Sequence, residues 1–194
     1  MRLPERSGDQ VRIGISITVP EPYASQLQDA RARYGDPWAD FIPPHITLIP
    51  PTVHEPDQLP VIGRYLDRIA AAHEPFVVRL RGTATFRPVS PVVFVQVVEG
   101  ISSCEVLERA VRTGPLVQEL QFPYHPHVTI AHEVDDDQLD AAFDGMAGFD
   151  ASFVVDQFHG YEHGDDGVWR PVREFRLGGG AHQAAGDRQA TVSS

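Results

Sequence analysis

A five-residue pattern occurs once in each half of the chain, and it constrains the fold more than any other feature. Residues 44–48 read PHITL and residues 126–130 read PHVTI. Chance alone gives about one H-x-[ST] triplet in a chain of this composition, so a repeat with matching flanks is informative. The motifs lie roughly 80 residues apart. This indicates two diverged copies of one unit, facing each other across a pseudo-twofold cleft.

Each motif is typical of a half-buried β-strand. Side chains alternate between the two faces of a strand, so His45 and Thr47 share one face and the apolar residues between and after them take the other. His127 and Thr129 are related in the same way. The proline before each histidine keeps the backbone extended and offers no N–H to a sheet, which suits a strand that begins at the wall of an open groove.

These four side chains predict phosphodiester chemistry. Two imidazoles across a cleft can divide acid and base duty, because the unperturbed pKa of histidine is about 6.5. Two hydroxyls beside them can donate hydrogen bonds to the non-bridging oxygens of a phosphate. We therefore expect His45 and His127 to be catalytic and Thr47 and Thr129 to bind phosphate, with no metal, cofactor or covalent intermediate. The residues leave open which histidine is the acid.

The order of the other elements predicts mixed helices and strands. Helices are expected at residues 22–35, 56–73, 102–114 and 135–146, the third capped by Ser102 or Ser103. Strands are expected at residues 11–20, 45–49, 76–86, 92–99, 127–131, 151–163 and 168–178. We interpret residues 1–10 as a flexible leader, residues 11–177 as one domain of two intertwined lobes, and residues 178–194 as a disordered tail.

Composition excludes several classes of protein. The single cysteine permits no intrachain disulfide and indicates a cytoplasmic protein. The amino-terminal residues lack the apolar core of a signal peptide, and no apolar run is long enough to cross a membrane. The net charge of −11 does not attract nucleic acid, so any polyanion that binds must be small or must meet a locally basic cleft. The chain has no lysine, which excludes Schiff-base chemistry.

The paired motifs and the order of elements resemble the two-histidine (2H) phosphoesterase superfamily, in its bacterial 2′-5′ RNA ligase-like branch. The resemblance covers roughly residues 11–177. It implies a bilobal α+β fold in which two antiparallel sheets face each other across a cleft, with helices outside. It also implies hydrolysis of 2′,3′-cyclic phosphate or 2′-5′ phosphodiester bonds, and a nucleotide or short RNA end as the partner. We expect a monomer.

The chain departs from this family at His132, where members often carry arginine or lysine. Phosphate affinity is therefore expected to be weaker, or to depend more on pH. Five further residues are expected to line the cleft: Trp38, Phe86, Tyr124, His125 and His132. One or two of the strand arginines are expected to reach it, from among Arg79, Arg81, Arg87, Arg170, Arg173 and Arg176. Phe86 and Trp169 are candidates for stacking a nucleobase.

Two alternative functions stay open. A non-catalytic nucleotide- or RNA-binding module would keep the same cleft without turnover, although such a module would be expected to have lost one of the H-x-T pairs. A metal-dependent hydrolase would use His125, His127 and His132 as ligands, because side chains at alternate positions of a strand can hold one metal. That alternative leaves His45 without a role.

Overall fold

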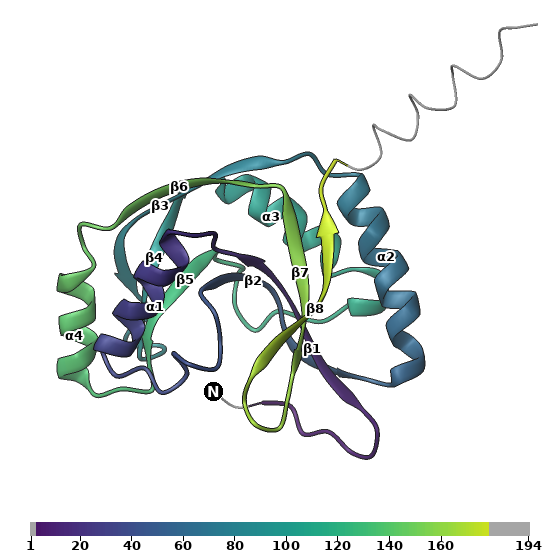
Figure 1. Ribbon diagram of the computed structural model, residues 1–194, viewed down its shortest axis with the longest axis horizontal. Helices are drawn as coiled ribbons and strands as arrows, with labels where there is room; N and C mark the ends of the chain where they lie inside the picture. The colour runs from purple at the N-terminus through teal and green to yellow at the C-terminus, as the bar shows by residue number, and fades with distance from the viewer. Residues whose placement is uncertain (1–2, 179–194) are drawn as a thin grey trace, which may run out of the picture.

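The computed structural model describes residues 3–178 and has an α+β fold with two four-stranded antiparallel sheets (Figure 1). The first sheet has the order β2 (His45–His54), β1 (Val11–Thr18), β7 (Gln157–His163), β8 (Trp169–Arg176). The second has the order β5 (His127–His132), β4 (Val92–Glu99), β3 (Phe76–Thr85), β6 (Asp150–Val155). The fold class predicted from the sequence is confirmed. The two motif strands, β2 and β5, occupy the corresponding edge of each sheet.

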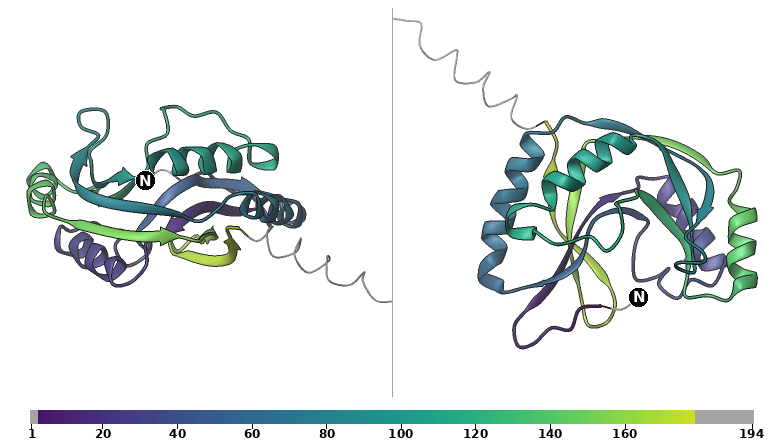
Figure 2. Two further views of the ribbon diagram at one scale, coloured as in Figure 1. Left: turned by 90° about the horizontal axis from the view of Figure 1, so that it is seen from above. Right: turned by 180° about the vertical axis from the view of Figure 1, so that it is seen from behind.

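Within residues 3–178, four α-helices gather at the two ends of the fold. They are α1 (Tyr23–Arg33), α2 (Leu59–Ala71), α3 (Ile101–Val111) and α4 (Asp136–Gly145). Figure 2 shows α1 and α4 together at one end and α2 and α3 at the other. Helix α1, which connects β1 to β2, packs against β5 of the second sheet. Helix α3, which connects β4 to β5, packs against β2 of the first. Each sheet therefore depends on a helix that belongs, in sequence, to the other.

The motif strands are anchored by their apolar residues. Ile46 and Leu48 of β2, and Val128 and Ile130 of β5, are almost completely inaccessible to solvent and belong to the main hydrophobic core. A slip of either strand by one residue would bury the His/Thr set and expose this apolar set, so burial fixes the register. Strands β2 and β5 also contact each other, which brings the two motifs to the same place.

Most elements differ from the predicted ranges by only a few residues at their ends, but three differences affect how the fold is built. The segment 151–163, expected as one strand, divides at Asp156 into β6 of the second sheet and β7 of the first. Both pieces favour extended backbone, so only pairing with distant strands separates them. Strand β2 continues to His54 through two prolines, which an edge strand tolerates. Helix α3 begins at Ile101 after Gly100 in the left-handed region (φ 87°), without a serine cap.

Most of the proposed leader lies within the described residues and contacts the first sheet and its loops. In the proposed leader, Arg6 forms an ion pair with Asp165, and Gln10 donates a hydrogen bond to Glu55 (2.7 Å). Beyond Gly178 the proposed tail lies outside the described residues. Within residues 3–178, no helix has both the length and the apolar character needed to cross a membrane.

Candidate active site

One cavity of about 660 Å³ is lined by both motif strands. It receives His45 and Thr47 from β2 and His127 and Thr129 from β5. The five other residues expected at the cleft also line it: Trp38, Phe86, Tyr124, His125 and His132. The structure thus brings all nine residues together, while their roles stay predictions.

A β-bulge in each motif strand shapes the cavity wall. On β2, neighbouring residues of β1 pair with Thr47 and Ile49, which leaves Leu48 without a partner. On β5, neighbouring residues of β4 pair with Thr129 and Ala131, which leaves Ile130 without one. A bulge adds one residue to one strand and so shifts the alternation of faces beyond it.

The bulge in β5 explains the position of His132. Plain alternation from His127 would turn His132 away from the cavity. Instead Ile130 and Ala131 are both buried, and His132 faces the cavity again. The bulges lie at the same position after each H-x-T triplet, so the two copies of the unit share this irregularity as well as the motif.

Both motif histidines are oriented by a backbone carbonyl two residues upstream. The Nδ1 atom of His45 lies 2.7 Å from the Pro43 oxygen, and that of His127 lies 2.7 Å from the His125 oxygen. A carbonyl oxygen only accepts hydrogen bonds, so Nδ1 carries the proton in each ring. The lone pair of the neutral ring therefore lies on Nε2. In His45 this atom is 3.1 Å from the Thr47 hydroxyl, which donates to it.

Aromatic rings pack against both imidazoles. The ring of His45 lies 4.6 Å from that of Trp169, centroid to centroid. The ring of His127 lies beside a packed pair of phenylalanines, 5.0 Å from Phe86 and 4.9 Å from Phe94. Burial disfavours the charged form of a histidine. It lowers the pKa of His45 to about 4, with the charges of Arg31 and His127 acting in the same direction. Burial also lowers the pKa of His127, and the nearby His125 adds to this effect.

Arg31 is the one arginine that lines the cavity within residues 3–178, and sequence analysis did not single it out. It lies on α1 with only 4% of its surface exposed, and its Nε donates to Asp36 Oδ2 at 3.0 Å. Leu27, Ala30 and Tyr34 are buried on the same helix face. An arginine at a three- and four-residue spacing within an apolar stripe is the signal that would have found it.

The strand arginines proposed for the cleft do not line it, so that expectation is wrong. All six are paired with neighbouring carboxylates at the surface. These ion pairs are Arg79–Asp150, Arg81–Asp150, Arg87–Asp140, Arg170–Asp166, Arg173–Asp67 and Arg176–Glu174. Trp169, a candidate for base stacking, does line the cavity, where it also packs against His45.

The metal-ligand alternative receives no support from the arrangement of donors. Across the part of the chain that the structure describes, no three His, Cys, Asp or Glu side chains converge in a way that could hold a metal ion. The rings of His125 and His127 lie 6.3 Å apart, centroid to centroid, in a stacked arrangement.

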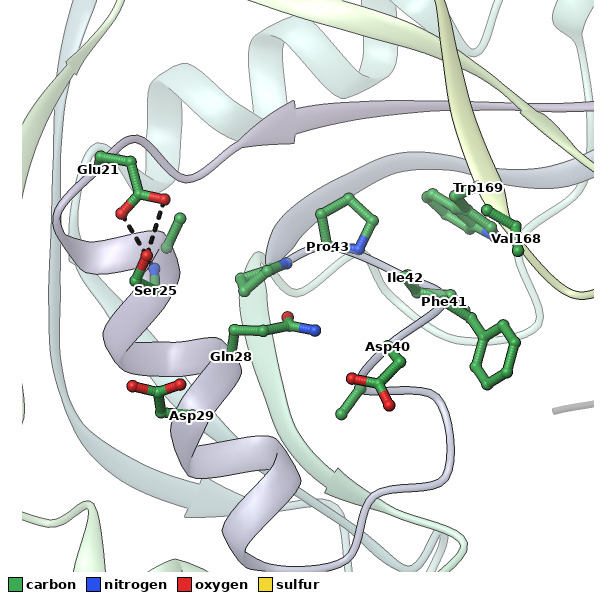
Figure 3. A pocket seen from close by; sticks show the side chains of 13 residues that line it. Glu21, Ser25, Gln28, Asp29, Asp40, Phe41, Ile42, Pro43, Val168 and Trp169 are labelled. Carbon is green, nitrogen blue, oxygen red and sulfur yellow. Dashed lines mark hydrogen bonds between the residues drawn. The ribbon is translucent and has the colours of Figure 1, made fainter.

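A second cavity of about 460 Å³ lies between α1 and the segment that precedes β2 (Figure 3). Its wall includes Ile42, Pro44 and Trp169, which also line the first cavity. Figure 3 shows the Ser25 side chain, which donates a hydrogen bond to the Glu21 carboxylate, at the edge of this second cavity. None of the nine residues considered above lines it. Only the first cavity therefore combines the motif residues.

Comparison with known protein families shows to which family the chain belongs. Residues 19–167 match the family model of the 2′-5′ RNA ligase superfamily. The chain belongs to this superfamily. Superfamily relatives from Bacillus thuringiensis (strain Al Hakam) and Bacillus anthracis (strain A0248), each named "Putative phosphoesterase", are 29% identical over 172 residues. The match covers 88% of this chain and 99% of each relative.

Solved structures of the superfamily share the fold. E. coli LigT complexed with 3′-AMP superposes with a TM-score of 0.68 at 20% identity, over 87% of this chain and 98% of LigT. E. coli LigT complexed with ATP superposes with a TM-score of 0.62 at 20% identity, over the same shares of both chains. At this identity the likeness establishes the architecture of the two sheets, and the chemistry of the cavity rests on its own residues.

Proposed function

We propose that this superfamily member is a metal-independent phosphoesterase that hydrolyses 2′,3′-cyclic phosphate or 2′-5′ phosphodiester bonds of nucleotides or RNA ends. One observation carries the proposal. Two imidazoles, each with its Nδ1 held by a backbone carbonyl, line the same cavity beside two threonine hydroxyls. Such a set supplies a base, an acid and donors for the phosphoryl oxygens without any further group.

The surroundings of the two histidines favour His45 as the base in hydrolysis. Its low pKa keeps Nε2 unprotonated near neutral pH. In the proposed step, Nε2 of His45 takes a proton from water as the water oxygen bonds to phosphorus. The bond from phosphorus to the leaving ribose oxygen breaks, and protonated His127 gives its proton to that oxygen. Thr47 and Thr129 donate hydrogen bonds to the non-bridging oxygens, and the product is a phosphomonoester.

Nucleotides are the natural first substrates to test. E. coli LigT, whose fold this chain shares, has been crystallised with 3′-AMP, with phosphate and with ATP. The cavity here is lined largely by aromatic and apolar side chains, which suits a nucleobase beside the reacting phosphate.

The test is product analysis with chelator-treated protein. We expect 2′,3′-cyclic nucleotides, 2′-5′ dinucleotides or RNA ending in a cyclic phosphate to yield phosphomonoesters. Replacing His45 or His127 by alanine should lower kcat by about 10²- to 10⁴-fold, because each supplies a proton-transfer group. His73→Ala is the matched control, since His73 bonds to Ile69 outside the cavity. It should keep full activity.

Three outcomes would contradict the proposal. Activity that survives replacement of both His45 and His127 would show that these histidines are not the catalytic pair. Activity that disappears with chelator and returns with added metal would indicate the metal-dependent alternative. Nucleotide affinity without any product across the whole panel would indicate the binding module, and circular dichroism of each variant would show that the fold is intact.

A further inference from the structure

The segment between α1 and β2 carries one of the two catalytic candidates into the cavity. It begins at Asp36 and ends at Pro44, directly before His45. It lies over the first sheet, where Trp169 of β8 donates its backbone N–H to Phe41 at 2.9 Å. Ile42 packs in a small separate hydrophobic cluster with Tyr161 and Trp169. The position of the His45 ring therefore depends on how this segment is held.

Arg31 holds the segment at both ends. Its Nε donates to Asp36 Oδ2 at 3.0 Å, and its Nη1 donates to the Ile42 carbonyl. The other Asp36 oxygen accepts the Trp38 backbone N–H at 2.9 Å. Arg31 and Asp36 are 4% and 5% exposed, so neither group is free to take another position in water. A planar guanidinium with several fixed donors suits such a double contact.

The contact to Ile42 lies one residue from the group that orients the imidazole. The Pro43 carbonyl follows the Ile42 carbonyl along the backbone and binds His45 Nδ1 at 2.7 Å. Arg31 also lines the cavity itself. The other groups that face His45 are His127 on β5, the Trp169 ring on β8, and the Thr47 hydroxyl on its own strand. Among these, Arg31 is the permanent charge.

We infer that Arg31 is a positioning residue for His45. Through the Ile42 and Pro43 carbonyls it fixes the ring with Nε2 toward the cavity, and its positive charge opposes protonation of that ring. The inference rests on the proposed function, in which His45 is the base. The inference also gives the buried Arg31–Asp36 ion pair a role beyond stability. Such a role is needed because apolar residues can often replace a buried ion pair without loss of stability. The effect of the Arg31 charge on the pKa of His45 has the direction that this role requires.

The direct test is the titration of His45 followed by NMR of its ring. Removing Arg31 alone would leave the Asp36 carboxylate buried with the Trp38 N–H but without a cation beside it, so the main variant is Arg31→Gln with Asp36→Asn, which replaces the ion pair by two amides. The His45 midpoint should rise by about half a pH unit, because the lost Arg31 charge opposes protonation of His45, while the simultaneous loss of the Asp36 charge makes this rise smaller than loss of the cation alone would give. With a cyclic nucleotide, kcat should fall about tenfold, since the base is displaced, while KM changes less.

The single variant Asp36→Asn distinguishes an effect of the Arg31 charge on His45 from a purely structural role of the Arg31–Asp36 pair. This variant keeps the Arg31 charge and removes the opposing one, so the His45 midpoint should fall or stay low. A structural role would move the midpoint in the same direction in both variants. Arg33→Gln, an exposed arginine on the same helix, is the matched control and should leave the midpoint and kcat unchanged.

Two results would overturn the inference. One is an unchanged His45 midpoint in the double variant when circular dichroism and Tm show a native fold. The other is a rise in KM with kcat preserved, which would make Arg31 a ligand of the substrate phosphate instead. The NMR titration needs no substrate. If the protein hydrolyses no phosphodiester, the midpoint still tests Arg31, so failure of the proposed function and failure of this inference are distinguishable.

Discussion

At the scale of single residues, the two motif histidines share an orientation and differ in surroundings. Each Nδ1 is held by a carbonyl, which leaves the lone pair of the neutral ring on Nε2. His45 packs on Trp169 near the charge of Arg31, whereas His127 packs against Phe86 and Phe94. The division of acid and base duty, which the sequence left open, follows from this difference under the proposed function.

The pH dependence of kcat/KM tests that division. His45 must be unprotonated, so activity should be lost as pH falls through its pKa of about 4. His127 must be protonated, and burial places its pKa below the ordinary value of about 6.5. Activity should therefore decline as pH rises through that lowered value, which gives a bell-shaped profile with a mildly acidic optimum. A profile that keeps rising above pH 8 would contradict the division.

The four motif residues are predictable from the sequence because strand alternation and repetition act within a few positions. Arg31 is not, because its partners, Asp36 and the Ile42 carbonyl, are brought to it by a folded loop. The position of His132 at the cavity is predictable through the family resemblance. The bulge that turns this side chain inward leaves no mark in the local pattern of residues.

At the scale of elements, the crossed packing of helices joins the two halves. Helix α1 packs against β5, and Tyr34 at its carboxyl end lies against Gly145 at the end of α4. The division of residues 151–163 between two sheets joins the halves again. Local propensity predicts the strands themselves, but their partners depend on contacts between segments far apart in the chain. This is why the sequence predicted one strand where the structure has two.

Gly145 gives a testable prediction about the contact between Tyr34 and the end of α4. A Cβ at this position would collide with the Tyr34 hydroxyl. Gly145→Ala should therefore lower the free energy of unfolding by about 1–3 kcal/mol, measured by urea denaturation, although alanine normally favours a helix. Tyr34→Phe in the same chain should restore most of the loss. Gly148→Ala, where nothing lies within 4 Å of the added atom, is the control. Equal effects at both glycines would show that the α1–α4 contact is loose.

At the scale of the whole molecule, the distribution of charge leads us to expect a small ligand. The net charge is −11, and the surface arginines of the strands are mostly paired with carboxylates. The cavity has one arginine within the described residues, itself paired with Asp36. Such a field favours a small phosphodiester over a long polyanion, which needs a series of cationic contacts.

Salt dependence measures the number of those contacts. For an oligonucleotide ending in a 2′,3′-cyclic phosphate, raising salt from about 50 to 200 mM should change KM by less than about threefold. A protein that contacts six to ten phosphates would lose about 10³- to 10⁵-fold in affinity over the same range. We also expect kcat/KM for a cyclic mononucleotide to equal or exceed that for the oligonucleotide. A steep salt dependence with a strong preference for the longer substrate would contradict this view of the surface.

The most direct measurement of the central claim is a crystal structure of the protein with orthovanadate and a nucleoside, which together mimic the five-coordinate transition state of phosphodiester hydrolysis. We predict a single vanadium centre whose oxygens accept or donate hydrogen bonds at Nε2 of both His45 and His127, with the Thr47 and Thr129 hydroxyls bonded to its other oxygens. Vanadate bound to one motif only, or bound away from both, would contradict the account.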